Sequence, residues 1–193
     1  MSGSSLNAAY FDGIFAADDD PWDLASSDYE AAKFQHTHDV LADRRYVRAF
    51  EIGCAHGVLT GQLVGLCDTL LAVDISSKAL AKARQRVGDR PGLTLKRMAF
   101  PNDVPNDAPY DLVILSEVAY YWSVADLDRA CEWLRASVEA GGRIILVHYT
   151  GETDYPHSGD AAVEALWAGL AEDFSVVMAE RRDRYRLDLW EKR

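Results

Sequence analysis

The stretch Glu51-Ile-Gly-Cys-Ala-His-Gly57 decides the fold, because it joins an apolar run at Tyr46–Ile52 to a helical pattern at Val58–Leu66. Glycines directly after a strand let the backbone approach a ligand. The spacing Gly53-x-x-x-Gly57 departs from the GxGxxG fingerprint of a dinucleotide site. The Glu51 carboxylate would repel a pyrophosphate but suits a ligand that carries an ammonium group. The stretch therefore predicts a strand-loop-helix site for a cationic ligand.

Short apolar runs alternate with longer helical patterns along the rest of the chain, which is typical of βαβ units on a parallel sheet. The last two alternating runs are joined by a link too short for a parallel crossover, so they predict an antiparallel hairpin. We therefore expect an α/β fold with a mixed seven-stranded sheet, parallel except for one antiparallel strand in the C-terminal hairpin, and helices on both faces. The expected strands are Tyr46–Ile52, Thr69–Val73, Leu93–Met98, Leu112–Leu115, Arg143–His148, Phe174–Arg182 and Arg184–Glu191, and the expected helices are Val58–Leu66, Ser77–Val87, Ala125–Ala140 (ending at Gly141-Gly142) and about Asp160–Leu170.

Two helices are expected before the first strand. Apolar residues from Leu6 to Phe15 fall on one helical face, and Ser27-Asp-Tyr-Glu30 matches a capping box that opens a helix running to about Leu41. Residues 1–30 contain seven acids and no Lys or Arg. We expect a single domain over residues 1–193, in which residues 1–43 form a helical lid and residues 44–193 the core.

Composition narrows the class of protein. The 193 residues carry a net charge of −11 with no basic stripe, which makes DNA, RNA and anionic membranes poor partners. The three cysteines form no CxxC pair, and the chain shows neither a secretory signal nor a membrane-length apolar run. We expect a cytoplasmic protein, a monomer or homodimer, with no metal, because no Cys, His and carboxylate cluster has ligand spacing.

Polar groups follow the expected strands, where an open α/β sheet binds its ligands. Asp74 ends the second strand and is placed to accept hydrogen bonds from ribose hydroxyls. Ser116-Glu117 ends the fourth strand and His148-Tyr149 the fifth. Glu117 and His148 are the expected catalytic pair: Glu117 would orient a cationic amine, and His148 would accept its proton, since an unperturbed histidine pKa of about 6.5 suits that task.

Four segments together resemble the motif series of class I S-adenosylmethionine-dependent methyltransferases: Glu51 to Gly57, Leu71-Ala-Val-Asp74, Asp111-Leu-Val-Ile-Leu-Ser-Glu117 and Gly141-Gly-Arg-Ile-Ile-Leu. Three more resemble the nodulation protein S group: Ala17-Asp-Asp-Asp-Pro-Trp22, Glu117-Val-Ala-Tyr-Tyr121 and His148 to Pro156. That group N-methylates the free amine of a glucosamine in a chitin oligosaccharide. The resemblance implies a Rossmann-like fold, the cofactor S-adenosylmethionine, the product S-adenosylhomocysteine and a small-molecule acceptor.

The resemblance also implies residue roles. Glu51, Gly53 and Gly57 would hold the methionyl end of the cofactor, and Asp74 the ribose. The adenine would lie between Ile75 on one side and Met98 and Ala99 on the other, Ala99 standing where many members have Asp. We further expect cofactor contacts from Trp22, Tyr29, Lys33 and Ser116, and acceptor contacts from Tyr120, Tyr121, Asp154 and His157.

For several of these residues a purely structural role is the alternative. Trp22 and Tyr29 could be ordinary helix packing, Lys33 a solvated helix position, and Tyr120 and Tyr121 core filling. The function we expect is methyl transfer to a small polar acceptor, with an amine nitrogen of an amino sugar or similar metabolite favoured. A small-molecule O-methyltransferase, an NAD-dependent oxidoreductase and a non-catalytic cofactor-binding protein are the rival hypotheses.

Overall fold

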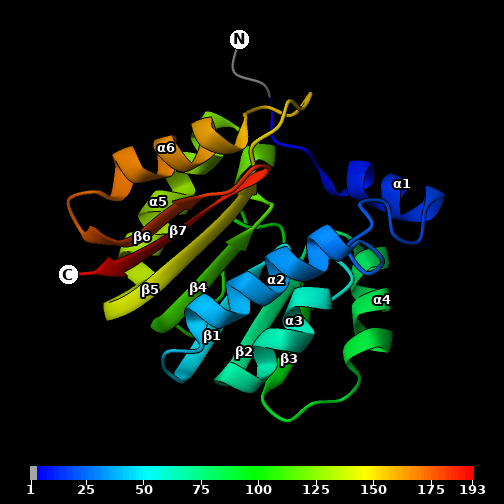
Figure 1. The fold of residues 1–193 in the computed structure, drawn as a ribbon, viewed down its shortest axis with the longest axis horizontal. Coiled ribbons are helices and arrows are strands. Elements are labelled where there is room, and N and C mark those ends of the chain that lie inside the picture. The colour runs from blue at the N-terminus through cyan, green and yellow to red at the C-terminus, as the bar shows by residue number, and fades with distance from the viewer. Residues whose placement is uncertain (1–3) are drawn as a thin grey trace. The chain divides into compact units, whose positions relative to one another are not determined.

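Seven strands form one mixed sheet in the order β3-β2-β1-β4-β5-β7-β6 in the computed structural model, which describes residues 4–193 (Figure 1). This confirms the predicted number of strands and the single antiparallel strand. Contacts divide the described residues into an N-terminal unit, residues 7–98, and a C-terminal unit, residues 4–6 with 99–193. None of the helices within residues 4–193 is long and apolar enough to cross a membrane.

The N-terminal unit contains three parallel strands, with β2 (Cys67–Asp74) between β1 (Tyr46–Ile52) and β3 (Leu93–Arg97). The buried run at the end of β1 explains its continuous apolar sequence, as expected for a strand covered by helices. The register sets Ile52 beside Val73, so the ends of β1 and β2 are level.

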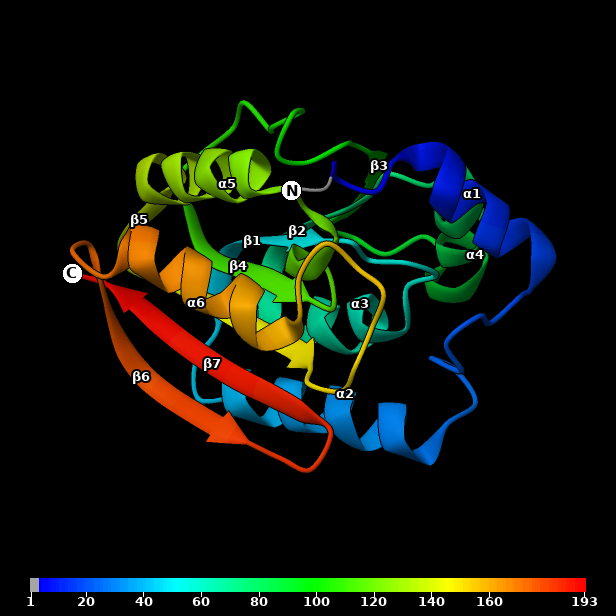
Figure 2. The same cartoon turned by 90° about the horizontal axis from the view of Figure 1, so that it is seen from above.

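The N-terminal unit contains four α-helices, α1 (Ala8–Ala17), α2 (Asp28–Leu41), α3 (Val58–Leu63) and α4 (Ser77–Val87), and a 3₁₀ helix, η1 (Val64–Leu66), directly after α3. Helix α3 packs against both α2 and α4, and α1 packs against α4 (Figure 2). The side chain of Ser76 caps α4 by accepting a hydrogen bond from the Ala79 N–H. The predicted capping box at Ser27 is wrong, because Ser27 makes no side-chain cap bond and Glu30 pairs with Lys33 instead.

The C-terminal unit holds β4 (Tyr110–Ser116), β5 (Val138–Tyr149), β6 (Phe174–Arg181) and β7 (Tyr185–Lys192). Strand β4 is parallel to β5, and β7 runs antiparallel to both β5 and β6, which confirms the predicted hairpin. Helices α5 (Val124–Ser137) and α6 (Gly159–Leu170) pack against each other and contact β5.

Helix α5 ends earlier than its sequence predicts. We expected Gly141-Gly142 to stop the helix, but α5 ends at Ser137 and both glycines lie within β5. Gly141 has a φ of +74°, and a Cβ on Gly142 would stand 2.8 Å from Val138 Cγ1 and 2.9 Å from the Glu139 carbonyl oxygen. The glycines therefore permit a crowded irregularity at the start of a strand.

Candidate functional site

Two buried carboxylates stand at neighbouring strand ends in the N-terminal unit. Glu51 is 2% exposed and Asp74 8% exposed. Burial raises the pKa of Glu51 to about 7, against the opposing effect of a 2.7 Å hydrogen bond from the Thr60 hydroxyl, and the negative charge of Asp74 raises it further. Glu51 thus shares a low-dielectric site with a like charge.

Asp74 is held by the backbone on both sides. Its Oδ1 accepts a hydrogen bond from the Ser76 N–H at 2.8 Å, and its Oδ2 accepts one from the Ala55 N–H at 2.9 Å. Burial nevertheless raises the pKa of Asp74 to about 6, with backbone N–H groups opposing the shift. A hydroxyl and peptide N–H groups therefore solvate the two acids, and a positively charged ligand group would stabilise both of them.

The loop at residues 53–57 turns sharply beside these acids. Gly53, Ala55 and Gly57 have φ values of +76°, +46° and +79°, in the left-handed region. The N–H groups of Gly53 and Cys54 both donate to the Val73 carbonyl, at 2.8 and 2.9 Å. A Cβ on Gly57 would lie 3.2 Å from the Ala83 Cα on α4, so close helix packing as well as backbone conformation requires glycine there.

Two apolar residues lie next to Asp74 at the end of β2. Met98 is buried, and its N–H donates to the Asp74 carbonyl at 3.0 Å, while the half-buried Ile75 follows Asp74 in the chain. The structure therefore brings together six of the residues expected to bind the cofactor: Glu51, Gly53, Gly57, Asp74, Ile75 and Met98.

The other predicted cofactor residues of this unit lie on or before α2. The Trp22 ring packs edge-on against Phe15, with centroids 5.5 Å apart. Lys33 is 2% exposed, pairs with the Glu30 carboxylate at 2.9 Å and lies 5.3 Å from the centre of the Tyr29 ring. The alternative of a solvated position for Lys33 is wrong.

In the C-terminal unit, Glu117 follows β4 with a φ of +56°. Its N–H donates to the Val147 carbonyl at 2.8 Å. Its carboxylate oxygen Oε2 accepts hydrogen bonds from the Tyr120 hydroxyl at 2.7 Å and from the Tyr149 N–H at 2.8 Å. Two donors and a left-handed backbone thus fix the orientation of one carboxylate at the ends of β4 and β5.

His148 is fully buried on β5. Its Nε2 accepts a hydrogen bond from the Ala119 N–H at 3.1 Å, and its ring lies edge-on to Tyr120 at 5.4 Å. A neutral imidazole that accepts at Nε2 carries its proton on Nδ1. Protonation at Nε2 would cost this hydrogen bond, which limits His148 as a proton acceptor.

Three tyrosines form a cluster beside Glu117. Tyr155 stacks on Tyr120 with centroids 5.3 Å apart, and Tyr121 lies edge-on to both at 4.6 Å. Burial raises the pKa of Tyr120 and of Tyr121 well above the ordinary value, and the nearby carboxylate of Glu117 raises that of Tyr120 further. Both residues therefore remain neutral phenols that can donate hydrogen bonds.

Four further predicted site residues of the C-terminal unit are half-buried or exposed. Ser116 is half-buried at the end of β4, and Ala99 is half-buried with its carbonyl accepting two backbone N–H groups. The His157 N–H donates to the Tyr120 carbonyl at 3.2 Å, which places His157 beside the tyrosine cluster. Asp154 is exposed on the same loop.

The chain matches the family model for nodulation protein S over residues 14–153. It belongs to the nodulation protein S family. Among relatives, it is 33% identical over 103 residues to nodulation protein S of Azorhizobium caulinodans, covering 53% of this chain and 49% of that protein. Nodulation protein S of Rhizobium tropici is 28% identical over 131 residues, covering 67% and 55%. The chain spans about half the length of these relatives.

Solved structures share the fold seen in this member of the family. The crystal structure of the N-methyltransferase NodS from Bradyrhizobium japonicum WM9, in complex with S-adenosylhomocysteine, has a TM-score of 0.82 at 18% identity and covers 97% of this chain and 99% of that chain. A solved structure from Pseudomonas syringae has a TM-score of 0.73 at 30% identity and covers 85% and 99%. The fold is therefore that of the NodS structure.

Sequence reasoning missed three contacts of the site. Thr60 reaches Glu51 from the first turn of α3, and the nine-residue spacing between the two matches no sequence motif. Tyr155 joins Tyr120 only through the folding of the loop after β5. His56 binds Asp20 across 36 residues of chain. Each of these partners is set by tertiary structure rather than by local pattern.

The raised pKa of Glu51 predicts how stability depends on pH. The folded protein holds a proton on Glu51 between about pH 4.5 and 7 that the unfolded chain has released, so this group's contribution to stability falls as pH rises through that window. Glu51→Gln removes the ionisation. We expect the ligand-free variant to gain about 2–3 kcal/mol in unfolding free energy, relative to the wild type, between pH 5 and pH 8. Denaturant titrations at several pH values measure this.

Asp89→Asn is the matched control, because Asp89 is exposed in the same unit. Its stability curve is expected to run parallel to that of the wild type. If the Glu51→Gln curve is also parallel, Glu51 ionises normally and burial does not raise its pKa.

Proposed function

We propose that this chain transfers a methyl group from S-adenosylmethionine to an amine nitrogen on a small polar acceptor such as an amino sugar. The observation that carries the proposal is the pair of buried carboxylates, Glu51 and Asp74, beside a left-handed glycine loop in a member of the nodulation protein S family. The NodS structure with S-adenosylhomocysteine supports the choice of cofactor.

The residues of the N-terminal unit fit this cofactor. When bound, S-adenosylmethionine supplies a methyl group on a positively charged sulfur. Glu51 offsets the charge of the methionyl ammonium, and Asp74 accepts hydrogen bonds from the ribose hydroxyls. Gly53 and Gly57 present bare backbone, and Ile75 and Met98 offer apolar surface to the adenine. In our proposal Ala99, Ser116, Trp22, Tyr29 and Lys33 remain further cofactor contacts.

Glu117 prepares the amine in the C-terminal unit. An ammonium has no lone pair, so the acceptor must lose a proton before it can react. The Glu117 carboxylate, held by the Tyr120 hydroxyl and the Tyr149 N–H, pairs with the ammonium and takes that proton. The neutral nitrogen then attacks in line: one N–C bond forms as one C–S bond breaks, and the sulfur leaves as a neutral thioether. Alignment and exclusion of water supply the rest of the catalysis.

His148 has an orienting role in this proposal. Its Nε2 already accepts the Ala119 N–H, which fixes the backbone immediately before Tyr120. The proton therefore goes to Glu117 rather than to His148. Tyr120 and Tyr121, with Tyr155, form an aromatic wall for the acceptor, and Asp154 and His157 are further polar contacts from the adjoining loop.

The helices before β1 are proposed as the lid. Residues 1–3 of this segment lie outside the described residues, and residues 4–6 belong to the C-terminal unit. Within the N-terminal unit, α1 is tied to the start of α4, because the Ser76 hydroxyl donates to the Asp12 carboxylate at 2.6 Å. Segments that close over a ligand are drawn from weakly held parts of a fold, so in this proposal the lid would have to release this partly buried hydrogen bond when it opens.

Asp74→Ala is expected to weaken S-adenosylmethionine binding about ten- to a hundredfold, because it removes a charged acceptor from the ribose. Titration calorimetry on the wild type and the variant measures the dissociation constants, with NAD as the comparison ligand. We expect no NAD binding, since Glu51 repels a pyrophosphate. Tight NAD binding, or an unchanged dissociation constant in Asp74→Ala, would contradict the assignment.

Glu117→Gln is expected to lower turnover of glucosamine by about 10²–10⁴-fold, the usual range for a general base, with cofactor affinity unchanged. Mass spectrometry of N-methylglucosamine and S-adenosylhomocysteine follows the reaction. His148→Ala leaves the Ala119 N–H unsatisfied, so it is expected to reduce stability more than turnover. If His148→Ala lowers turnover strongly and Glu117→Gln does not, His148 is the general base.

The same assay with a panel of amines and alcohols tests the type of acceptor. Methylation confined to hydroxyl acceptors would overturn N-methylation. Cofactor binding without any turnover across the panel would indicate a non-catalytic binding protein.

A further inference from the structure

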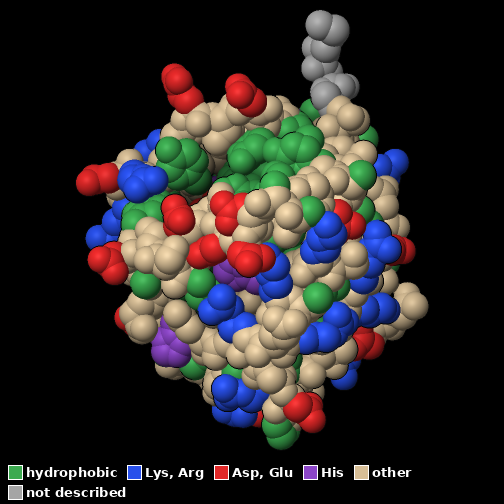
Figure 3. Space-filling view, turned by 90° about the vertical axis from the view of Figure 1, so that its right-hand side faces the viewer, with side chains coloured by type: hydrophobic (Ala, Val, Ile, Leu, Met, Phe, Trp, Pro, Cys, Tyr) green, Lys and Arg blue, Asp and Glu red, His purple; other side chains and the backbone are tan. Residues whose placement is uncertain are grey.

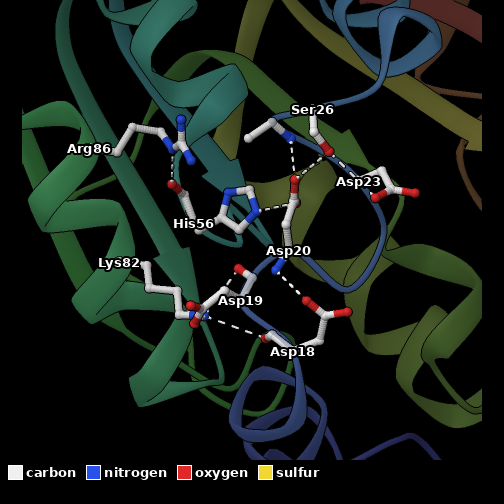
Figure 4. Close-up of polar contacts among 9 residues, drawn as sticks. Asp18, Asp19, Asp20, Asp23, Ser26, His56, Lys82 and Arg86 are labelled. Carbon is white, nitrogen blue, oxygen red and sulfur yellow. Dashed lines mark hydrogen bonds and ion pairs between the residues drawn. The ribbon is translucent and has the colours of Figure 1, made fainter.

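One side-chain contact in the N-terminal unit joins the turn before α2 to the loop at residues 53–57. His56 Nε2 lies 2.7 Å from Asp20 Oδ1. Figure 4 draws the two side chains facing each other across this contact. The His56 side chain is 2% exposed, and its Nδ1 is buried without a hydrogen-bond partner among residues 4–193. Asp20 is therefore the polar partner that holds this ring, and its loss would leave both ring nitrogens buried and unsatisfied.

Asp20 also organises its own turn. Its Oδ2 accepts hydrogen bonds from the Ala25 N–H at 3.0 Å and from the Ser26 hydroxyl at 3.1 Å, and its N–H donates to Asp18 Oδ1 at 2.9 Å. One carboxylate oxygen thus holds the segment 18–27 together, while the other reaches the loop. Trp22 lies inside this segment, so the placement of Trp22 depends on the same carboxylate.

On the loop side of this contact, the position of His56 depends on the backbone conformation of its neighbours. His56 stands between Ala55 and Gly57, both in the left-handed region, and the Arg86 guanidinium donates from Nε to the His56 carbonyl at 3.0 Å. This backbone conformation sets the direction of the His56 side chain toward Asp20. The contact therefore depends on the conformation of the loop.

The residue before Asp20 in the chain makes a separate ion pair. Lys82 on α4 binds the Asp19 carboxylate at 2.6 Å, and Asp19 is fully exposed, so this ion pair contributes little. Acidic side chains gather on the face that carries α1 and α4, with Lys and Arg side chains beside them (Figure 3). Burial would raise the pKa of Asp20, but hydrogen bonds from His56, Ala25 and Ser26 outweigh burial and lower the pKa. Asp20 is therefore ionised at neutral pH and can accept a hydrogen bond from His56 Nε2.

We propose that Asp20 and His56 are positioning residues that couple the segment 18–27 to the cofactor loop, so that the loop conformation that binds the cofactor also holds this segment in place and slows cofactor release. The coupling is reciprocal by thermodynamic linkage: the segment stabilises the loop as much as the loop stabilises the segment. The effect on release rests on the proposed function, whereas the coupling itself does not.

Hydrogen exchange on the ligand-free, full-length chain tests the coupling. His56→Ala is expected to speed exchange of the Ala25 and Ser26 amides about ten- to a hundredfold, although neither amide touches His56. Asp20→Ala is expected to speed exchange of the Gly53, Cys54 and Gly57 amides in the loop. Asp20→Asn keeps an oxygen acceptor and is expected to rescue most of the loop protection.

Asp19→Asn is the matched control, because it makes the same change of charge one residue away and breaks only the exposed pair with Lys82. Its exchange pattern is expected to match the wild type. If Asp20→Ala affects only the segment 18–27 and His56→Ala only the loop, the two elements are independent and the coupling is refuted.

Stopped-flow dissociation of S-adenosylhomocysteine tests the consequence. We expect both His56→Ala and Asp20→Ala to raise the dissociation rate about tenfold or more, with the association rate nearly unchanged. Unchanged dissociation in variants that have lost the exchange coupling would refute the role in cofactor release. If the wild type binds no S-adenosylhomocysteine, the proposed function fails while the exchange result still decides the coupling.

Discussion

Burial of Glu51 and Asp74 at adjacent strand ends is the constraint on which the rest of the N-terminal unit depends. Ionising two carboxylates in a low-dielectric site is costly, and the protein meets that cost with one hydroxyl and peptide N–H groups. The left-handed loop delivers one of those groups, the Ala55 N–H, which donates to Asp74 Oδ2 at 2.9 Å. A fold that keeps this arrangement is prepared for a cationic ligand.

The C-terminal unit also holds a carboxylate at a strand end, that of Glu117, but with different hydrogen-bond donors. Glu117 is half-buried, and its carboxylate accepts hydrogen bonds from the Tyr120 hydroxyl and the Tyr149 N–H. Its backbone has a positive φ, which is strained for a residue other than glycine. Strain of this kind persists where the surrounding structure over-determines a residue, and it is concentrated at functional sites. Both units thus hold a carboxylate in a fixed orientation at a strand end.

Most of the sheet could be predicted from the sequence, because apolar runs such as Tyr46–Ile52 are long, regular and flanked by turn residues. Gly141 and Gly142 misled the prediction, since a glycine pair marks a helix stop as readily as a strand irregularity. The acids at the strand ends were also predictable, because their place follows from topology. Their partners Thr60, Tyr155 and Asp20 were not, since side-chain contacts across distant segments leave no local pattern.

The most direct test of the account is a titration of the Glu51 carboxyl by carbon-13 NMR, in the free protein and with S-adenosylmethionine bound. The resonance is assigned by its loss in Glu51→Gln. We predict a midpoint near the pKa of about 7 in the free protein, and a fall of one unit or more when the ligand's ammonium group offsets the charge. An ordinary glutamate midpoint in the free protein, or one that S-adenosylmethionine leaves unchanged, would contradict it.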